Sequence, residues 1–313
     1  ALNDGDINRA VREIDRLCHT FIVRHLPSAG HLRLMSATIR AVIALERIGD
    51  YAVSISREAV QIASLPDNSL ARLLEIMGNE SADMLRQALA AFKEGNADKA
   101  KGVMGMADQM ERHLTNVFHE LTHEEAKRPI KDLFALFVVF SLLERVSDQA
   151  KNLCEETVFA VTGETKAAKV YRVLFLDEAN DCQSQMAQAI GRKTFPNSGV
   201  FESAGRTAAG ALDAGMTRFM EEHGCSMEEA RPRKLDMTPT ELGAYHVIVS
   251  LQGPVRDYLD EIPFHTTALQ WDVGDAPSNM DDIEAGRSYE EMYRKISVEL
   301  RVLLEKLRGP GAD

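Results

Sequence analysis

Two pairs of carboxylates in the first half of the sequence have a spacing suited to cation binding. Glu46 and Asp50 are four residues apart, and Glu144 and Asp148 repeat this spacing in a second copy of the segment Leu-Glu-Arg-Ile/Val-Gly/Ser-Asp. Residues four apart on a helix lie on one face, about 5–6 Å from each other. Carboxylates so close repel each other unless a positive charge compensates. Such oxygen-rich pairs suit Mg²⁺, Mn²⁺, Fe³⁺ or Ca²⁺.

A structural interpretation of the same pairs stays open. Arg47 and Arg145 each follow the first carboxylate of a pair and could neutralise it, or one carboxylate of each pair could simply face water. The duplication of the motif, with large apolar residues beside both copies, favours metal binding as much as this structural role.

The elements that must position these pairs have helical periodicity. No stretch from residue 1 to about 162 alternates like a strand, and the prolines fall near expected helix starts or in loops. The pattern predicts helices at 6–26, 30–62, 68–95, 97–123 and 128–161. It divides into a repeat at 1–62 and a second repeat, with one helix more, at 63–162. We expect the missing helix of the first repeat to lie upstream of Ala1. Otherwise, the apolar face of the repeat that this helix would cover should be paired between chains.

The hydrophobic pattern of the sequence changes after a linker predicted at 163–169. Short apolar runs rich in β-formers alternate with helical patterns, at 170–176, 200–203, 245–251 and 266–271. Strands that alternate with helices at this spacing indicate βαβ units and a parallel sheet. The sequence therefore predicts an α/β domain at 170–313 after a helical domain.

Composition excludes several classes of protein. With 36 Lys+Arg against 48 Asp+Glu, the net charge of −12 argues against binding to nucleic-acid phosphates. The four cysteines are scattered without a CxxC pair, which is typical of a reduced, cytosolic protein. No apolar run reaches the roughly 18 residues of a membrane span, and no secretory leader is visible. We expect a cytoplasmic protein without membrane insertion, nucleic-acid partner or nucleotide cofactor.

The first half resembles the PhoU family of phosphate-signalling regulators. The segment 31–50 and its second copy carry the resemblance, which covers about residues 1–162. In that family two three-helix bundles each carry a carboxylate motif of this spacing, and some members bind iron or zinc clusters there. The resemblance implies that the two carboxylate pairs bind iron, zinc or another divalent cation. It adds weaker candidate ligands on the preceding helices, Asp6, Asp108 and Glu111. The histidines at 113, 119 and 123 do not share one helix face, so we expect them to be solvated.

The second half resembles the low-molecular-weight tyrosine phosphatase and arsenate reductase superfamily. In that superfamily an anion loop reads Cys-x5-Arg-Ser after the first strand, and here residues 177–184 occupy its place. Further matches in the same order occur at 202–205, 219–224, 230–235, 245–250 and 271–275. The resemblance covers about residues 170–307 and implies that Asn180 and Ser184 belong to the anion loop.

The superfamily's chemistry needs a thiolate nucleophile, an arginine that binds the oxyanion and an aspartic acid that protonates the leaving group. The nucleophile position holds Asp177 and the arginine position holds Gln183, while the acid position is kept as Asp275. Cys182 matches a non-nucleophilic cysteine of the arsenate reductases, and Cys225 is predicted to be a core residue. We therefore expect a catalytically degenerate loop rather than an enzyme.

Three interpretations of Asp177 stay open. Asp177 could belong to an active site that has lost its activity, a retired site, with its carboxylate accepting hydrogen bonds from the loop N–H groups that once bound phosphate. It could form part of an allosteric or partner surface. It could also bind a cation together with Glu178 and Asp181, with phosphoryl transfer to Asp177 by analogy with aspartyl-phosphate enzymes.

The combined prediction is a multidomain protein with α and α/β parts, PhoU-like helical bundles followed by a parallel-sheet phosphatase-like domain. Its expected function is cytosolic regulation of phosphate signalling or transport. We expect it to act through contacts with phosphate-transporter or sensor-kinase components. We also expect a homo-oligomer, specifically a homodimer. The alternative is an enzyme of arsenate reduction or phosphate-ester hydrolysis. A metal store or sensor is a third hypothesis.

Overall fold

The computed structural model describes residues 4–64, 66, 69–123, 128–166, 168–277 and 281–309. The chain divides into two compact units, Ala1–Ala167 and Ala168–Asp313. The division falls inside the segment 163–169, which the sequence pattern predicts as a linker. No helix in the described ranges is long and apolar enough to cross a membrane.

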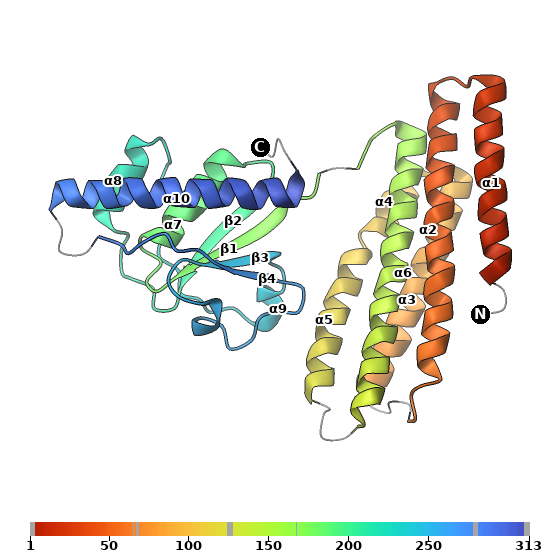
Figure 1. Ribbon diagram of the computed structural model, residues 1–313, viewed down its shortest axis with the longest axis horizontal. Helices are drawn as coiled ribbons and strands as arrows, with labels where there is room; N and C mark the ends of the chain where they lie inside the picture. Colours follow the sequence, from red (N-terminus) through yellow and green to blue (C-terminus); the bar gives the residue numbers. More distant parts are fainter. Residues whose placement is uncertain are drawn as a thin grey trace. The chain divides into compact units, whose positions relative to one another are not determined.

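The first unit is helical and is built around its last helix. Helix α6 (Ile130–Thr162) contacts α2, α3, α4 and α5, whereas α1 packs on α2 (Figure 1). The other helices are α1 (Asp4–His25), α2 (Ala29–Ala59), α3 (Ser69–Glu94), α4 (Ala97–Met104) and α5 (Ala107–His123). Because α6 is covered on several sides, its apolar residues are not confined to one stripe, and Leu136, Phe140 and Leu153 are all buried. The predicted helical class of this half is confirmed.

One predicted helix is wrong, because the single helix expected at 97–123 is two helices. Helix α4 ends at Met104 and is followed by Gly105, and the Met106 N–H donates to the Val103 carbonyl at 3.0 Å, a tighter turn than the α-helical one. Glycine loses more backbone entropy in a helix than other residues. Gly102 and Gly105 therefore weaken the helix where it breaks.

The two repeats differ in what covers their last helix. In the second repeat Ala150, Cys154 and Val158 of α6 are buried in a cluster with residues of α3 and α4. The matching positions on the first repeat, 98 residues earlier, are Ala52, Ser56 and Val60, and all three are exposed. The side chain of Val60 is 79% exposed, against 7% for Val158. Within the described residues, this face of α2 thus has no helix over it.

The second unit is a four-stranded parallel sheet with strand order β2-β1-β3-β4. The strands are β1 (Tyr171–Asp177), β2 (Gly199–Gly205), β3 (Val247–Ser250) and β4 (Thr267–Gln270). All four lie within or beside the apolar runs from which they were predicted, so the predicted parallel α/β class is confirmed. Because the strands are parallel, the loops after β1, β2 and β3 meet at one edge of the sheet.

Helices cover both faces of this sheet. On one face lie α7 (Gln183–Thr194), α8 (Ala214–Glu222) and α10 (Asp282–Arg308), and on the other lie α9 (Pro239–Leu242) and the 3-10 helix η1 (Val255–Asp257) (Figure 1). Alternate residues of β1 pack into the apolar cores on the two faces of the sheet, with Phe175 on the first face and Leu174 and Leu176 on the second. The only tryptophan, Trp271, packs 5.8 Å from Phe175 between ring centroids.

Strand β2 forms one edge of the sheet, and side chains occupy its outward backbone groups. Nε of Arg192 donates to the Phe201 carbonyl at 3.1 Å, and Nε of Arg233 donates to the Ser203 carbonyl at 3.2 Å. Further along, Gly205 exchanges backbone hydrogen bonds with the segment 233–235. The outer side of β2 is therefore largely closed to pairing with another strand.

Candidate functional site

The loop between β1 and α7 is organised around the carboxylate of Asp177. This residue ends β1 and is 2% exposed. The N–H groups of Asn180 and Ser184 donate to its two carboxylate oxygens at 2.5 and 2.9 Å. Burial raises the pKa of Asp177, although these hydrogen bonds favour its ionised form. Two loop N–H groups thus already have an acceptor within the chain, which is the contact that the retired-site interpretation of Asp177 predicts.

Asn180 fixes the shape of the loop. Its φ of 51° is left-handed, a conformation that asparagine tolerates better than most residues. Its side chain donates to Oγ of Ser184 at 2.8 Å and accepts from the Arg233 N–H at 2.7 Å and from Nε2 of Gln185 at 3.0 Å. A Cβ on Gly205 would lie 2.6 Å from the Asn180 nitrogen, so β2 needs glycine there. The predicted anion-loop residues Asn180 and Ser184 therefore belong to one buried network.

Gln183 joins the loop to the segment that holds the predicted acid. Its Nε2 donates to the Gly274 carbonyl, one residue before Asp275, and the side chain is 1% exposed. Its Oε1 is buried and has no hydrogen-bond partner in the described part of the chain. Asp275 is exposed, so the loop and the acid position are neighbours through the backbone rather than through the carboxylate.

Both cysteines of this unit are buried thiols. Cys182 is 2% exposed, and burial together with the carboxylates of Asp213, Asp177 and Asp181 raises its pKa far above the ordinary value. A thiol that stays protonated is a poor nucleophile. Cys225 is also 2% exposed and belongs to the core cluster, so its predicted core position is confirmed.

The mouth of the loop holds an ion pair that the sequence did not predict. Nη2 and Nε of Arg206 lie 2.7 and 3.0 Å from Oε2 of Glu178. The Glu178 N–H donates to Oε1 of Gln252 at 2.9 Å, and the Tyr258 hydroxyl donates to the Gln252 carbonyl at 2.5 Å. Glu178, proposed from the sequence as a cation ligand with Asp177 and Asp181, is thus paired with an arginine instead. The strand was predicted at 200–203, three residues before Arg206, so the sequence carried no local signal for this pair.

In the helical unit, the second carboxylate pair forms a close contact. Glu144 and Asp148 share a side-chain hydrogen bond, and burial, followed by Asp148 and Glu111, raises the pKa of Glu144 to about 7. Burial also raises the pKa of Asp148. Arg145 is exposed and only partly opposes the shift of Glu144. The second pair is therefore incompletely neutralised by its neighbouring arginine.

The first pair has the same exposure as the second: Glu46 and Glu144 are half-buried, and Asp50 and Asp148 are exposed. The weaker candidates have varied surroundings. Asp6 pairs with Arg9, and Asp108 lies 3.6 Å from Lys151. In the described ranges, no three His, Cys, Asp or Glu residues form a group that could hold a metal ion.

The three histidines of α5 differ in how they fit the prediction. His113 is not solvated as expected, because its Nε2 lies 3.4 Å from Glu80 in a partly buried pair. His119 is exposed. The side chain of His123 lies outside the described residues.

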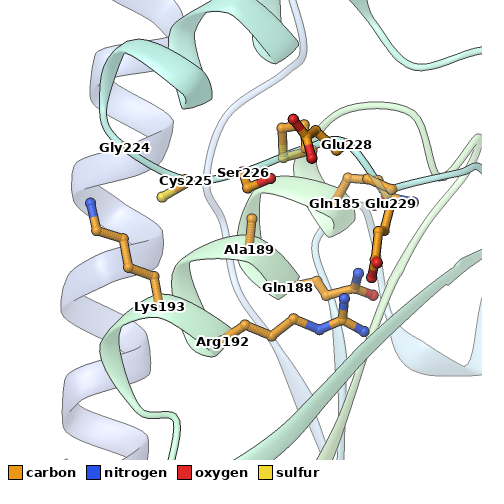
Figure 2. Close-up of a pocket in the computed structure, with 12 residues that line it drawn as sticks. Gln185, Gln188, Ala189, Arg192, Lys193, Gly224, Cys225, Ser226, Glu228 and Glu229 are labelled. Atoms are coloured by element: carbon orange, nitrogen blue, oxygen red, sulfur yellow. The ribbon is translucent and has the colours of Figure 1, made fainter.

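A separate pocket of about 380 Å³ lies between α7 and the segment 224–230 (Figure 2). Small-molecule sites have volumes of this order. Its lining includes Cys225 but none of the residues predicted to act in the anion loop. Gln185 is its link to that loop, because Nε2 of Gln185 contacts Asn180.

Comparison with known proteins separates the chain into the same two parts. Residues 1–59 and 74–157 match the profile of the PhoU domain. Residues 172–310 match that of the low molecular weight phosphotyrosine protein phosphatase family.

Individual relatives match one part each. A phosphate-specific transport system accessory protein PhoU homolog of Pseudomonas putida is 32% identical over 51% of this chain, which spans only 64% of that relative. The homolog of Clostridium acetobutylicum is 30% identical over 51% of this chain and 74% of its own length. The solved structure of the tyrosine phosphatase Wzb from Escherichia coli K30 in complex with sulphate is 19% identical, with a TM-score of 0.36, over 44% of this chain and 99% of that one.

Proposed function

Since this chain belongs to the PhoU family, with a phosphatase-like domain joined to its helical part, we propose that it is an accessory regulator of phosphate transport. It would act through protein contacts with phosphate-transporter or sensor-kinase components in the cytoplasm. The observation that carries this proposal is the match of residues 1–157 to relatives that are named accessory proteins of the phosphate-specific transport system.

The first test is association. We expect the tagged chain to retain phosphate-transporter components when it is purified from membranes solubilised with detergent. Asp177→Asn is a matched control, because it alters the anion loop and leaves the helical unit unchanged, so association should persist. A chain that retains neither transporter nor sensor-kinase components would contradict the proposal.

We propose further that the phosphatase-like domain is catalytically silent. Asp177 places a carboxylate where an oxyanion would dock and accepts two loop N–H groups. Gln183 is neutral and its amide is already bonded to Gly274. The remaining loop thiol, Cys182, is buried, and burial and nearby carboxylates raise its pKa, which disfavours the reactive thiolate. Loss of one oxyanion donor typically lowers rates by about 10²–10³. The loss of both the nucleophile and the arginine therefore supports a silent loop more strongly than an active phosphatase or arsenate reductase.

Two substitutions should restore anion binding if the scaffold is otherwise intact. Asp177→Cys alone should gain little, because the thiolate would have no arginine to balance the oxyanion. Asp177→Cys with Gln183→Arg should bind phosphate or arsenate and show weak phosphatase turnover with Asp275 as the acid. Titration calorimetry on the wild type, both single variants and the double variant makes the comparison. Tight phosphate binding by the wild type would overturn the silent-loop proposal.

The helical carboxylates support a proposal of metal binding. Glu144 and Asp148 are in contact, and burial and their proximity raise the pKa of Glu144; iron, zinc or another divalent cation would relieve this unfavourable placement of two carboxylates. The observations favour this second pair over Glu46 and Asp50, because burial and the neighbouring carboxylates raise the pKa of Glu144. Any further ligands would have to come from water or from residues that move, since no third side chain in the described ranges completes a group.

Elemental analysis of purified protein tests this proposal. Glu46→Ala with Asp50→Ala should remove about half of the bound metal, and the corresponding double substitution at Glu144 and Asp148 should remove the remainder. Glu80→Ala, on α3, serves as a control and should leave the metal content unchanged. Purified protein without transition metal, or double variants that keep all of it, would show that the pairs are structural.

The exposed face of α2 supports the proposal of a homodimer. Ala52, Ser56 and Val60 occupy positions that are buried in the second repeat, and Val60 is 79% exposed, so a second copy could cover this face as α3 and α4 cover its counterpart. Ala52→Glu with Val60→Glu should therefore lower the sedimentation coefficient to that of a monomer. Arg57→Glu is a control on the same turn. A wild-type chain that sediments as a monomer at high concentration would contradict the proposal.

A further inference from the structure

We propose that Arg206 is the oxyanion-binding residue at the mouth of the anion loop, and that Glu178 occupies it as an internal competitor. The ligand class is phosphate, either inorganic or as a phosphomonoester. The inference rests on the proposed silence of the loop, and it identifies what keeps the loop closed. Asp177 accepts hydrogen bonds from the backbone N–H groups, and Glu178 forms an ion pair with the guanidinium. Two acidic side chains therefore occupy the two sets of donors that would bind one anion.

The geometry of Arg206 is that of a preformed anion receptor. Its Nη2 and Nε both face Oε2 of Glu178, at 2.7 and 3.0 Å, and Nε also lies 3.2 Å from Oε1. Arginine uses the same pairs of parallel N–H groups to bind phosphate oxygens. Nη1 donates to the Asp257 carbonyl at 3.2 Å, and the guanidinium carbon lies 5.8 Å from the centre of the Tyr258 ring. These contacts hold the guanidinium in place independently of Glu178.

Arg206 and Asp177 belong to the same site. The backbone N–H of Arg206 donates to the Asp177 carbonyl at 3.2 Å. Burial and the carboxylates of Asp177 and Glu178 raise the pKa of Tyr258 to about 12, so both carboxylates act on one phenol. Glu178 follows β1, Arg206 follows β2 and Gln252 follows β3. The carboxyl ends of adjacent parallel strands are where open α/β sheets bind ligands.

The charges explain why the site is closed and how it could open. Position 183 supplies no positive charge, and Arg206 supplies one from the neighbouring strand. The carboxylates of Asp177 and Glu178 oppose this positive charge. A phosphate dianion is therefore repelled until at least one of them is neutralised or displaced. The side chains of Arg206 and Glu178 are 54% and 46% exposed, and ion pairs that water reaches are weak. Glu178 can therefore be exchanged for another anion without unfolding the loop.

The test is a series of variants in the full chain, titrated with inorganic phosphate and with phenyl phosphate. The series comprises the wild type, Asp177→Ser, Glu178→Gln, the double variant, and the double variant with Arg206→Gln. We expect no binding by the wild type at millimolar phosphate. The double variant should bind at least about tenfold more tightly than Asp177→Ser alone, since a charge-assisted contact is gained, and Arg206→Gln should remove this gain.

A matched control separates this effect from a general change of charge. Glu299→Gln, on the exposed side of α10, removes the same charge in the Asp177→Ser background and should leave phosphate affinity unchanged. Trp271 fluorescence verifies folding, and Asp177→Asn replaces Asp177→Ser if the serine variant does not fold. Binding of phenyl phosphate alone would assign the site to phosphomonoesters, and binding of inorganic phosphate alone would assign it to free phosphate. Equal binding of both would show that the site recognises the phosphate group that they share.

Two results would overturn the inference. The first is a double variant that binds no better than Asp177→Ser with Glu299→Gln, and the second is a gain that survives Arg206→Gln. Neither result depends on the wild-type measurement, which bears on the silence of the loop. A wild type that binds phosphate tightly would contradict the proposed function, whereas the dependence on Arg206 would still decide the role of that residue.

Discussion

Buried backbone N–H groups must find acceptors, and the loop between β1 and α7 meets this constraint with a side chain of its own. Asp177 accepts the N–H groups of Asn180 and Ser184, and Asn180 in turn holds Ser184, Arg233 and Gln185. The loop therefore keeps its shape without an anion. The close approach of Gly205 and the bond from Gln183 to Gly274 then tie β2 and the segment before Asp275 to the same loop.

The same carboxylate chemistry has opposite outcomes in the two units. In the α/β unit, acidic groups are satisfied by N–H groups and by Arg206, so they stabilise a closed loop. In the helical unit, Glu144 and Asp148 are in contact, and burial together with the charges of Asp148 and Glu111 raises the pKa of Glu144, which Arg145 opposes only in part. An acidic group that is hydrogen-bonded or ion-paired within the chain has a structural role, whereas one without such partners remains available to bind a cation.

Local patterns predicted most of this fold, because they report on local physics. The apolar runs at 170–176 and 245–251 become β1 and β3, and the carboxylate pairs lie on helices α2 and α6 as their spacing requires. The break between α4 and α5 was missed because glycines at helical spacing weaken a helix without ending it. The pairing of Glu178 with Arg206 was not predictable in this way, since it joins residues that follow different strands and depends on parallel packing of the sheet. The burial of His113 against Glu80 similarly depends on how two helices pack.

The closed outer side of β2 has a consequence for how copies of this chain can grow into larger assemblies. A free strand edge on a domain that is repeated in every copy would allow sheets to extend end to end and polymerise. Here Arg192 and Arg233 occupy the outward carbonyls of that edge, and Gly205 is already paired. Even at high local concentration, this edge of the sheet therefore offers few free backbone groups to a strand of another copy.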